Sequence, residues 1–289
     1  MRTIIQRIII IGLLPLFLLS MSACHKEKLG KTEVPDFYVL PQGNQPYDDS
    51  IVAFHKKYGS YILYNFNEKD FRFDFIRYLD ASAKVGNPAY VANTLQFFKS
   101  QCLNYYPETY LQKTMPFRIL LSAAIDTMFY QSVTRELHRS YSGFYATRTM
   151  MAIGWTDSTL LQQTPERLKE LRGFMHMAYT QQALLSGALK LPDDYLKYTL
   201  PSYTSIAGWN LGEIGQVADV NFLIPIERNE AWDFATFVGM ITSHTKADLD
   251  TTFLSASYDT KGLVNLKYNV VIRFYKELGI DLQAIGELP

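Results

Sequence analysis

The amino-acid sequence predicts an α+β fold, because segments with strand patterns are followed by helical segments rather than alternating strictly with them. The chain has 289 residues, of which 20 are tyrosine and 18 are phenylalanine, and these large side chains are suited to building one substantial core. No repeat, low-complexity block or second long apolar run follows the N-terminal segment. We therefore expect residues 46–289 to form a single globular domain containing a small mixed sheet packed against several helices, with two lobes as the alternative.

Residues 1–23 have the pattern of a lipoprotein signal peptide. Arg2 and Arg7 flank the start of an apolar run over residues 8–19, which is shorter than the roughly 20 residues that a helix needs to span a bilayer. Two small residues stand directly before Cys24, whose thiol would accept a diacylglyceryl group. We predict cleavage before Cys24 and anchoring of the mature chain there; an uncleaved anchor helix and an ordinary secretory signal are the alternatives.

Residues 24–45 are expected to be a lipidated tether, because the charged stretch after the cysteine contains too few apolar residues to fold alone. His25 follows Cys24, where an aspartate would favour retention in the inner membrane. The sequence thus predicts an outer-membrane lipoprotein of the cell envelope, and leaves its periplasmic or surface placement open. The mature chain is therefore expected to bind the membrane through its N-terminal lipid.

Charge and cysteine content exclude two classes of protein. The 28 basic and 28 acidic residues become 26 and 28 once the two signal-peptide arginines are removed, and a chain without a basic excess is not expected to bind nucleic acid. Cys102 is the only other cysteine. If Cys24 is acylated, no intramolecular disulfide can form, so the fold must be stabilised by packing.

The first part of the domain is expected to contain a helix and two strands. A helix over residues 47–58 has apolar positions at helical spacing after an acidic start. Ile62, Tyr64 and Phe66 occupy every second position over residues 62–66. Phenylalanines alternate with polar residues over 71–75. Period-two alternation predicts half-buried strands in both segments.

The middle of the chain predicts a helix, two strands and then a long helix. Apolar residues recur every three or four positions over residues 88–106, and strands are expected over 116–121 and 146–155. Pro165 suits the first turn of a helix that extends to about residue 185 with one continuous face.

The last part predicts a loop followed by two helices. Residues 191–215 are rich in Pro, Gly, Asp and Ser, which is typical of loops. Helices are expected over residues 230–244 and 263–278, and Gly279 is a natural stop for the second.

Histidine spacing argues against a self-contained metal site. No two of the five histidines stand three to five residues apart, whereas zinc ligands one helical turn apart would share a face. Glu136 and His138 lie two residues apart and are interpreted as a solvated charged edge. The sequence also lacks a serine-nucleophile elbow and a phosphate-binding glycine loop.

The order of segments resembles the zinc-binding metallopeptidase lipoproteins of Bacteroidota, a zincin-like family. The likeness covers most of the mature chain and begins at residues 54–59 with Phe-His-Lys-Lys-Tyr-Gly, followed by alternating aromatic residues. It continues through residues 117–121 and 144–155, which look like the sheet before the family's active-site helix. Residues 268–282 are similar to the closing helix. The resemblance implies a zincin-like α+β fold.

In that family the active-site helix carries His-Glu-x-x-His, whose histidines bind zinc and whose glutamate deprotonates the bound water. The resemblance places His176 at the first ligand, Met177 at the general base and Thr180 at the second ligand. The family's Glu-Asp-Phe-Ala-Glu segment is similar to the residues around Asp233, with Trp232 and Thr236 at the glutamate positions.

A slip of two residues would bring Glu230 to a ligand position. Even so, methionine cannot accept a proton and a threonine hydroxyl is a poor zinc ligand. The resemblance therefore implies a degenerate site at His176, Met177, Thr180, Glu230 and Asp233, with no cofactor expected unless zinc were rescued by such a slip. His176 as an ordinary core residue of an unrelated α+β lipoprotein is the alternative.

These inferences predict a catalytically inactive lipoprotein that binds a peptide, a glycan or a partner protein. An active zinc-dependent metallohydrolase with other ligands is the first alternative. The second is an accessory subunit of an outer-membrane nutrient-uptake complex.

Overall fold

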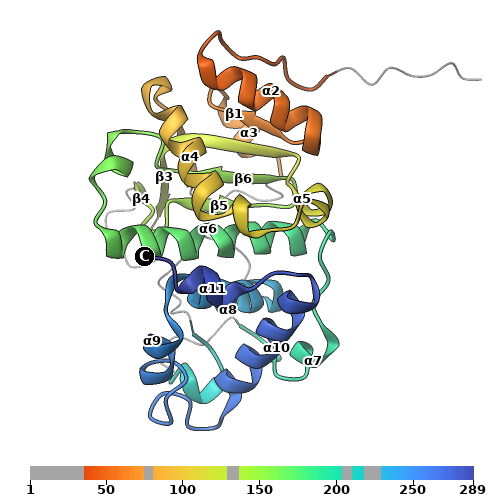
Figure 1. Ribbon diagram of the computed structural model, residues 1–289, viewed down its shortest axis with the longest axis vertical. Coiled ribbons are helices and arrows are strands. Elements are labelled where there is room, and N and C mark those ends of the chain that lie inside the picture. Colours follow the sequence, from red (N-terminus) through yellow and green to blue (C-terminus); the bar gives the residue numbers. More distant parts are fainter. Residues whose placement is uncertain (1–35, 75–80, 129–136, 204–209, 218–228) are drawn as a thin grey trace, which may run out of the picture. The chain divides into compact units, whose positions relative to one another are not determined.

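The computed structural model describes residues 36–74, 81–128, 137–203, 210–217 and 229–289 (Figure 1). The chain divides into two compact units, residues 1–39 and 40–289, and the fold described below is that of the larger unit. The predicted signal peptide and Cys24 lie outside the described residues. Of the helices in the described ranges, none is long and apolar enough to cross a membrane.

A mixed sheet forms the upper layer of the domain in Figure 1. Within the described residues it has six strands, in which the order β1-β3-β6-β5 is extended by β2 and β4 on β3. Their bounds are Tyr61–Leu63 (β1), Ala81–Val85 (β2), Arg118–Met128 (β3), Leu137–Arg139 (β4), Phe144–Ala146 (β5) and Met150–Ile153 (β6).

Strand β3 holds the sheet together by pairing differently along its length. Its first residues pair in parallel with β1 and β6, and its later residues pair in antiparallel orientation with β2 and β4. Ile119, Leu120 and Leu121 are completely buried, because neighbours cover both faces of this strand. The predicted strand over residues 116–121 is therefore confirmed and extends further.

The described residues form ten α-helices, of which the five longest lie where the sequence predicts helices and the five short ones were not predicted. They are α2 (Pro46–Tyr58), α3 (Glu68–Phe71), α4 (Val91–Gln101), α5 (Glu108–Thr114), α6 (Pro165–Leu185), α7 (Asp193–Leu196), α8 (Glu230–Ser243), α9 (Lys246–Thr251), α10 (Leu263–Glu277) and α11 (Leu282–Gly286). Short 3-10 turns occur at Pro88–Tyr90 (η2), Leu103–Tyr105 (η3), Ser158–Gln162 (η4) and Gly212–Ile214 (η5). In its described residues, 191–203 and 210–215, the predicted loop contains α7 and η5.

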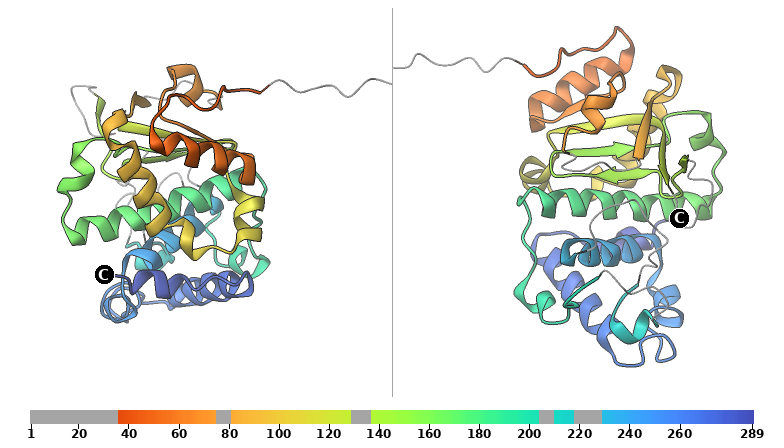
Figure 2. Two further views of the ribbon diagram at one scale, coloured as in Figure 1. Left: turned by 45° about the horizontal axis from the view of Figure 1, so that its top comes forward. Right: turned by 180° about the vertical axis from the view of Figure 1, so that it is seen from behind.

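Helix α6 lies between the sheet and the C-terminal helices (Figure 2). It packs against β5 and β6 on one side and against α8 on the other. Its N-terminus is fixed by Thr164, whose side chain accepts a hydrogen bond from the backbone N–H of Arg167, and Pro165 occupies the first turn. The sequence signals for this helix are thus confirmed, and the helix forms the partition between two layers.

The predicted strand over residues 71–75 is wrong. Asn67 accepts hydrogen bonds from the backbone N–H groups of Lys69 and Asp70 and starts the short helix α3, so capping prevails over the alternating phenylalanines. Phe71 is fully buried whereas Phe73 is 63% exposed, so the alternation does not mark one buried face. Residues 75–80 lie outside the described part of the chain.

The predicted strand over residues 146–155 is confirmed over β6, while its first residue, Ala146, ends β5, the other strand of a hairpin. Strands β5 and β6 pair in antiparallel orientation, and the turn between them is held by Asp74. The Asp74 carboxylate accepts hydrogen bonds from the hydroxyls of Thr147 and Thr149 and from the Thr149 backbone N–H. The predicted helix over residues 88–106 divides into η2, α4 and η3. These fold differences leave the α+β class unchanged.

Candidate functional site

Helices α6 and α8 approach each other most closely at two glycines. A Cβ atom added to Gly173 would lie 2.6 Å from the carbonyl oxygen of Gly239, and one added to Gly239 would lie 3.1 Å from the Cβ of Met177. At Gly173 only a residue without a side chain fits, and at Gly239 a Cβ would make a tighter contact than is usual. The glycines therefore allow the two helices to pack closely at one point.

A cavity of about 240 Å³ opens beside this crossing. Helix α6 contributes one stripe of its lining and α8 another, and the rest comes from Val217, His244 and Phe253. The lining residues on the two helices are Glu170, Gly173, Phe174, Met177, Thr236, Gly239, Met240 and Ser243. Aliphatic, aromatic and methionine side chains predominate, so the cavity is suited to an apolar group.

At the rim, Glu170 is already engaged by other residues. Its carboxylate accepts a hydrogen bond of 2.6 Å from the hydroxyl of Tyr141 and forms an ion pair of 2.5 Å with Arg167. The Arg167 guanidinium lies 3.8 Å from the centre of the Tyr141 ring, which is cation–π geometry. These contacts fix the Glu170 carboxylate at the edge of the cavity.

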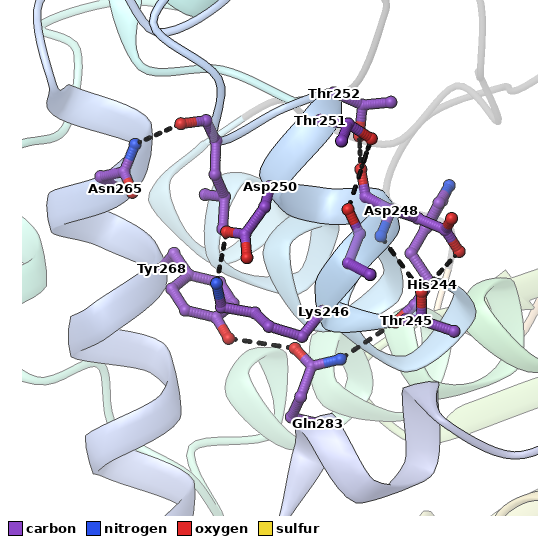
Figure 3. Close-up of polar contacts among 12 residues, drawn as sticks. His244, Thr245, Lys246, Asp248, Asp250, Thr251, Thr252, Asn265, Tyr268 and Gln283 are labelled. Carbon is purple, nitrogen blue, oxygen red and sulfur yellow. Dashed lines mark hydrogen bonds and ion pairs between the residues drawn. The ribbon is translucent and has the colours of Figure 1, made fainter.

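His244 and Phe253, which flank α9, also line the cavity. Their rings meet edge to face, with centroids 5.6 Å apart. Figure 3 shows the polar contacts that hold this region: Thr245 caps α9, and Gln283 donates to the carbonyl of His244 while accepting from the hydroxyl of Tyr268. The α9 wall of the cavity is therefore attached to α10 and α11.

His176 does not line this cavity. Its side chain is fully buried and faces residues that end α4 and form η3. The Nε2 atom lies 2.9 Å from the carbonyl oxygen of Gln101, and Nδ1 lies 2.6 Å from the hydroxyl of Tyr106. Since a carbonyl can only accept, Nε2 carries the proton and Nδ1 accepts from Tyr106.

The electrostatics agree with this neutral tautomer. Burial lowers the pKa of His176 to about 3, and the nearby charge of Arg172 acts in the same direction. Cys102 lies with its sulfur 4.0 Å from Nδ1, and burial raises the pKa of its thiol. His176 is thus an uncharged, hydrogen-bonded residue of the core.

Thr180 also points into packed structure. Its hydroxyl is fully buried and lies 2.8 Å from the hydroxyl of Tyr275 on α10. Met177, in contrast, lines the α6–α8 cavity. The three positions that the resemblance assigned to one catalytic motif therefore lie in different environments.

The acidic candidates on α8 separate in the same way. Glu230 is half-buried in the first turn of the helix. Asp233 is fully buried and forms an ion pair of 2.7 Å with Lys267 and a hydrogen bond of 2.9 Å with Tyr203. Burial raises the pKa of Asp233, and the charge of Lys267 opposes that shift. Asp233 is therefore committed to a buried pair between α8 and α10.

The residues at these positions do not fit a zinc ion. Both nitrogens of His176 already take part in hydrogen bonds, the Thr180 hydroxyl contacts Tyr275, and Met177 supplies no carboxylate. Across the described ranges, no group of three or more His, Cys, Asp or Glu side chains could hold a metal ion. Of the remaining sequence candidates, His138 is an exposed residue of β4, and Glu136 lies outside the described residues.

The fold does bring two of the resemblance positions together. Met177, at the general-base position, and Thr236, at a glutamate position, both line the cavity. Sequence reasoning missed the glycine pair at the crossing. Gly173 and Gly239 both lie inside predicted helices, where a glycine normally destabilises the helix. That signal could have located the site.

Comparison with known proteins bears on the fold. No family model and no curated protein matches the sequence. A solved structure from Bacteroides caccae, described as a "putative zinc-binding metallo-peptidase", matches with a TM-score of 0.50 and 14% identity over 83% of this chain and 88% of that one. At this identity the likeness shows the architecture alone. The domain therefore has a zincin-like α+β fold, similar to that of the Bacteroides caccae protein.

Proposed function

We propose that this chain is an outer-membrane lipoprotein, anchored through Cys24, whose metallopeptidase-like domain has no catalytic activity and binds a peptide, a glycan or a partner protein. The α6–α8 cavity is the proposed binding site. The signal-peptide pattern of residues 1–23 supports the anchor, and the fold supports the origin of the domain.

The observation that carries the loss of catalysis is the environment of α6. A zincin mechanism needs a carboxylate beside a metal-bound water, and the Met177 position provides a thioether instead. His176 has no free lone pair, since Nδ1 accepts from Tyr106 and Nε2 donates to Gln101. Restoring a single group would not restore the site, because these side chains face different surroundings.

The cavity lining favours an apolar group of a peptide or protein over a glycan. Phe174, Met177 and Phe253 present carbon and sulfur atoms to the cavity, whereas a sugar would require hydrogen-bond partners for each buried hydroxyl. The hydroxyl of Ser243 already donates a hydrogen bond of 2.8 Å to the carbonyl oxygen of Gly239. We infer that one apolar side chain of the ligand enters here.

The first test measures zinc and hydrolysis together. Full-length protein purified in detergent should contain zinc well below one ion per chain and should not release fluorescent fragments from labelled casein, with or without added zinc. Stoichiometric zinc with chelator-sensitive cleavage of casein would establish the active metallohydrolase alternative and refute the proposal.

The second test measures binding to the same protein. We expect fluorescein-labelled peptide pools carrying Leu, Met or Phe at one position to bind, and pools carrying Ser, Asn or Gln there to bind much more weakly. Ser243→Leu should fill the cavity and keep the apolar side chain of the ligand out. Binding should weaken about tenfold, because each methylene group of the ligand that is no longer buried costs about 0.8 kcal/mol. The matched control is Ser100→Leu on α4, where the hydroxyl also bonds a backbone carbonyl of the preceding helical turn. Equal binding by both pools, or by both variants, would refute the site.

Membrane attachment is tested separately. Labelling cells with an azide-bearing palmitate should tag the wild-type chain and not Cys24→Ser, and outer-membrane fractions should contain only the former. Capture of a transporter from intact envelopes by the wild-type chain, retained after Ser243→Leu, would favour the accessory-subunit alternative, because that contact would not use the cavity.

A further inference from the structure

A second hollow lies between α2 and α4 and shares no residue with the α6–α8 cavity. Its volume is about 720 Å³, which is within the range of specific binding sites. The floor consists of four buried apolar side chains, Ile51, Ile62, Phe98 and Leu111. We call this hollow the α2–α4 groove.

The α2–α4 groove is long enough for a large ligand. Half-buried Phe54, Tyr58 and Leu95 line its sides, while the upper edges carry the small residues Ala53 and Ala92. From Tyr47 to Tyr58 the groove follows α2 for 11 residue steps, about 16 Å at the helical rise of roughly 1.5 Å per residue. Three turns of another helix have this length.

The charge on the groove is positive and confined to one end. Lys57 and Lys99 are exposed lining residues, and the described lining contains no Asp or Glu. Lys57 forms an ion pair of 2.9 Å with Glu108, but their side chains are 46% and 56% exposed, and such surface pairs are weak. The lysine end can therefore attract additional carboxylates.

The same end carries the C-terminal turns of both wall helices. Lys57 is in the last turn of α2, Lys99 is in the last turn of α4, and Leu103, Asn104 and Leu111 line the groove beyond them. Helix C-termini carry partial negative charge and helix N-termini partial positive charge. The N-terminus of a docked helix is thus favoured at this end, and acidic residues suit both its first turn and the two lysines.

We propose that the α2–α4 groove docks an amphipathic helix of a partner protein, with apolar anchors on the floor and an acidic first turn at Lys57 and Lys99. Helix-in-groove recognition uses anchors at i, i+3, i+4 and i+7, which match a floor of separate apolar side chains between two helices. A peptide that binds by adding a strand would need the edge of a sheet for its backbone groups, and the described lining comes mainly from helices.

The test uses full-length protein in detergent and a fluorescein-labelled synthetic helix with leucines at that spacing and glutamates in its first turn. We expect saturable binding, a loss of at least about tenfold when the glutamates are moved to the last turn or replaced by lysine, and a similar loss with Ala92→Trp, which fills the groove from an exposed position. Lys99→Glu should weaken binding several-fold. Lys56→Glu is the matched control, because it makes the same charge change on α2 outside the lining.

Four results would overturn the proposal. They are the absence of saturable binding to folded wild-type protein, equal binding of all three peptides, unchanged binding by Ala92→Trp, and equal weakening by Lys56→Glu and Lys99→Glu. Displacement of the peptide by dodecanoate would assign the groove to an acyl chain, and self-association abolished by Ala92→Trp would assign it to a second copy of this chain. Either outcome would also refute a helical partner.

Ser243→Leu should leave helix binding unchanged, so failure of the cavity proposal and failure of this one are distinguishable.

Discussion

Two pairs of neighbouring residues on α6 have opposite properties although they belong to one helix. His176 and Thr180 are buried polar residues whose hydrogen bonds reach Gln101, Tyr106 and Tyr275. Gly173 and Met177 border a cavity lined mostly by apolar groups. The first pair uses its polar atoms for structure, and the second leaves room for a ligand.

This difference follows from the chemistry of the side chains. Buried polar groups are costly unless each is hydrogen-bonded, so the imidazole and the hydroxyl are stable only with fixed partners. A methionine at a cavity has no such requirement and adapts to irregular contacts. Stability should therefore depend on His176 and Thr180, and binding on Met177.

The strongest test of that contrast is His176→Ala. We expect the free energy of unfolding to fall by about 3–5 kcal/mol, because the change leaves a cavity and removes the partner of the buried Tyr106 hydroxyl and the Gln101 carbonyl. Denaturant unfolding of the full-length protein, followed by tryptophan fluorescence, measures the loss. A decrease below about 1 kcal/mol would mean that this side of the helix is loosely packed.

Lowering the pH should reduce the free energy of unfolding through the same residue, His176. The folded pKa of His176, about 3, is below the usual value of 6.5, so below pH 6.5 the unfolded chain binds a proton that the folded chain does not. This contribution to stability is fully present above pH 6.5 and is lost as pH falls towards 3. At pH 4.5 the loss amounts to about 3 kcal/mol, at roughly 1.4 kcal/mol for each unit. Comparing the pH dependence of unfolding in wild type and His176→Gln isolates it, and identical slopes would contradict a buried neutral imidazole.

Thr180→Val should have a smaller effect on stability. Valine keeps the shape but leaves the Tyr275 hydroxyl without its 2.8 Å partner, which costs about 1–2 kcal/mol. Thr180→Ser, which keeps the hydroxyl, is the control and should lose less. If the two variants unfold at the same denaturant concentration, the hydroxyl contact does not contribute.

Met177→Ala should give the smallest change in stability and a measurable change in binding. The side chain already borders empty space, so the unfolding free energy should fall by less than about 1 kcal/mol. Binding of the Leu, Met and Phe peptide pools should weaken, because the cavity loses apolar contact area. Large destabilisation with unchanged binding would reverse the roles assigned to the two pairs of α6 residues.

Local sequence signals determined most of the secondary structure. Pro165 started a helix where predicted, and Gly279, with φ of +78°, ended another, because capping and chain reversal depend on the few residues nearby. The same local signals failed at Phe71 and Phe73, where the cap at Asn67 prevailed over alternation. The lipid anchor at Cys24 is also a local signal and stays a prediction.

The α+β class and the long partition helix were thus determined by the sequence alone, together with the absence of a carboxylate at Met177. Only the tertiary structure decided which way each α6 residue faces, and that the Gly173–Gly239 crossing borders a cavity. The physical reason is distance along the chain. Tyr106 lies 70 residues before His176 and Tyr275 lies 95 residues after Thr180, so no local pattern could specify these partners.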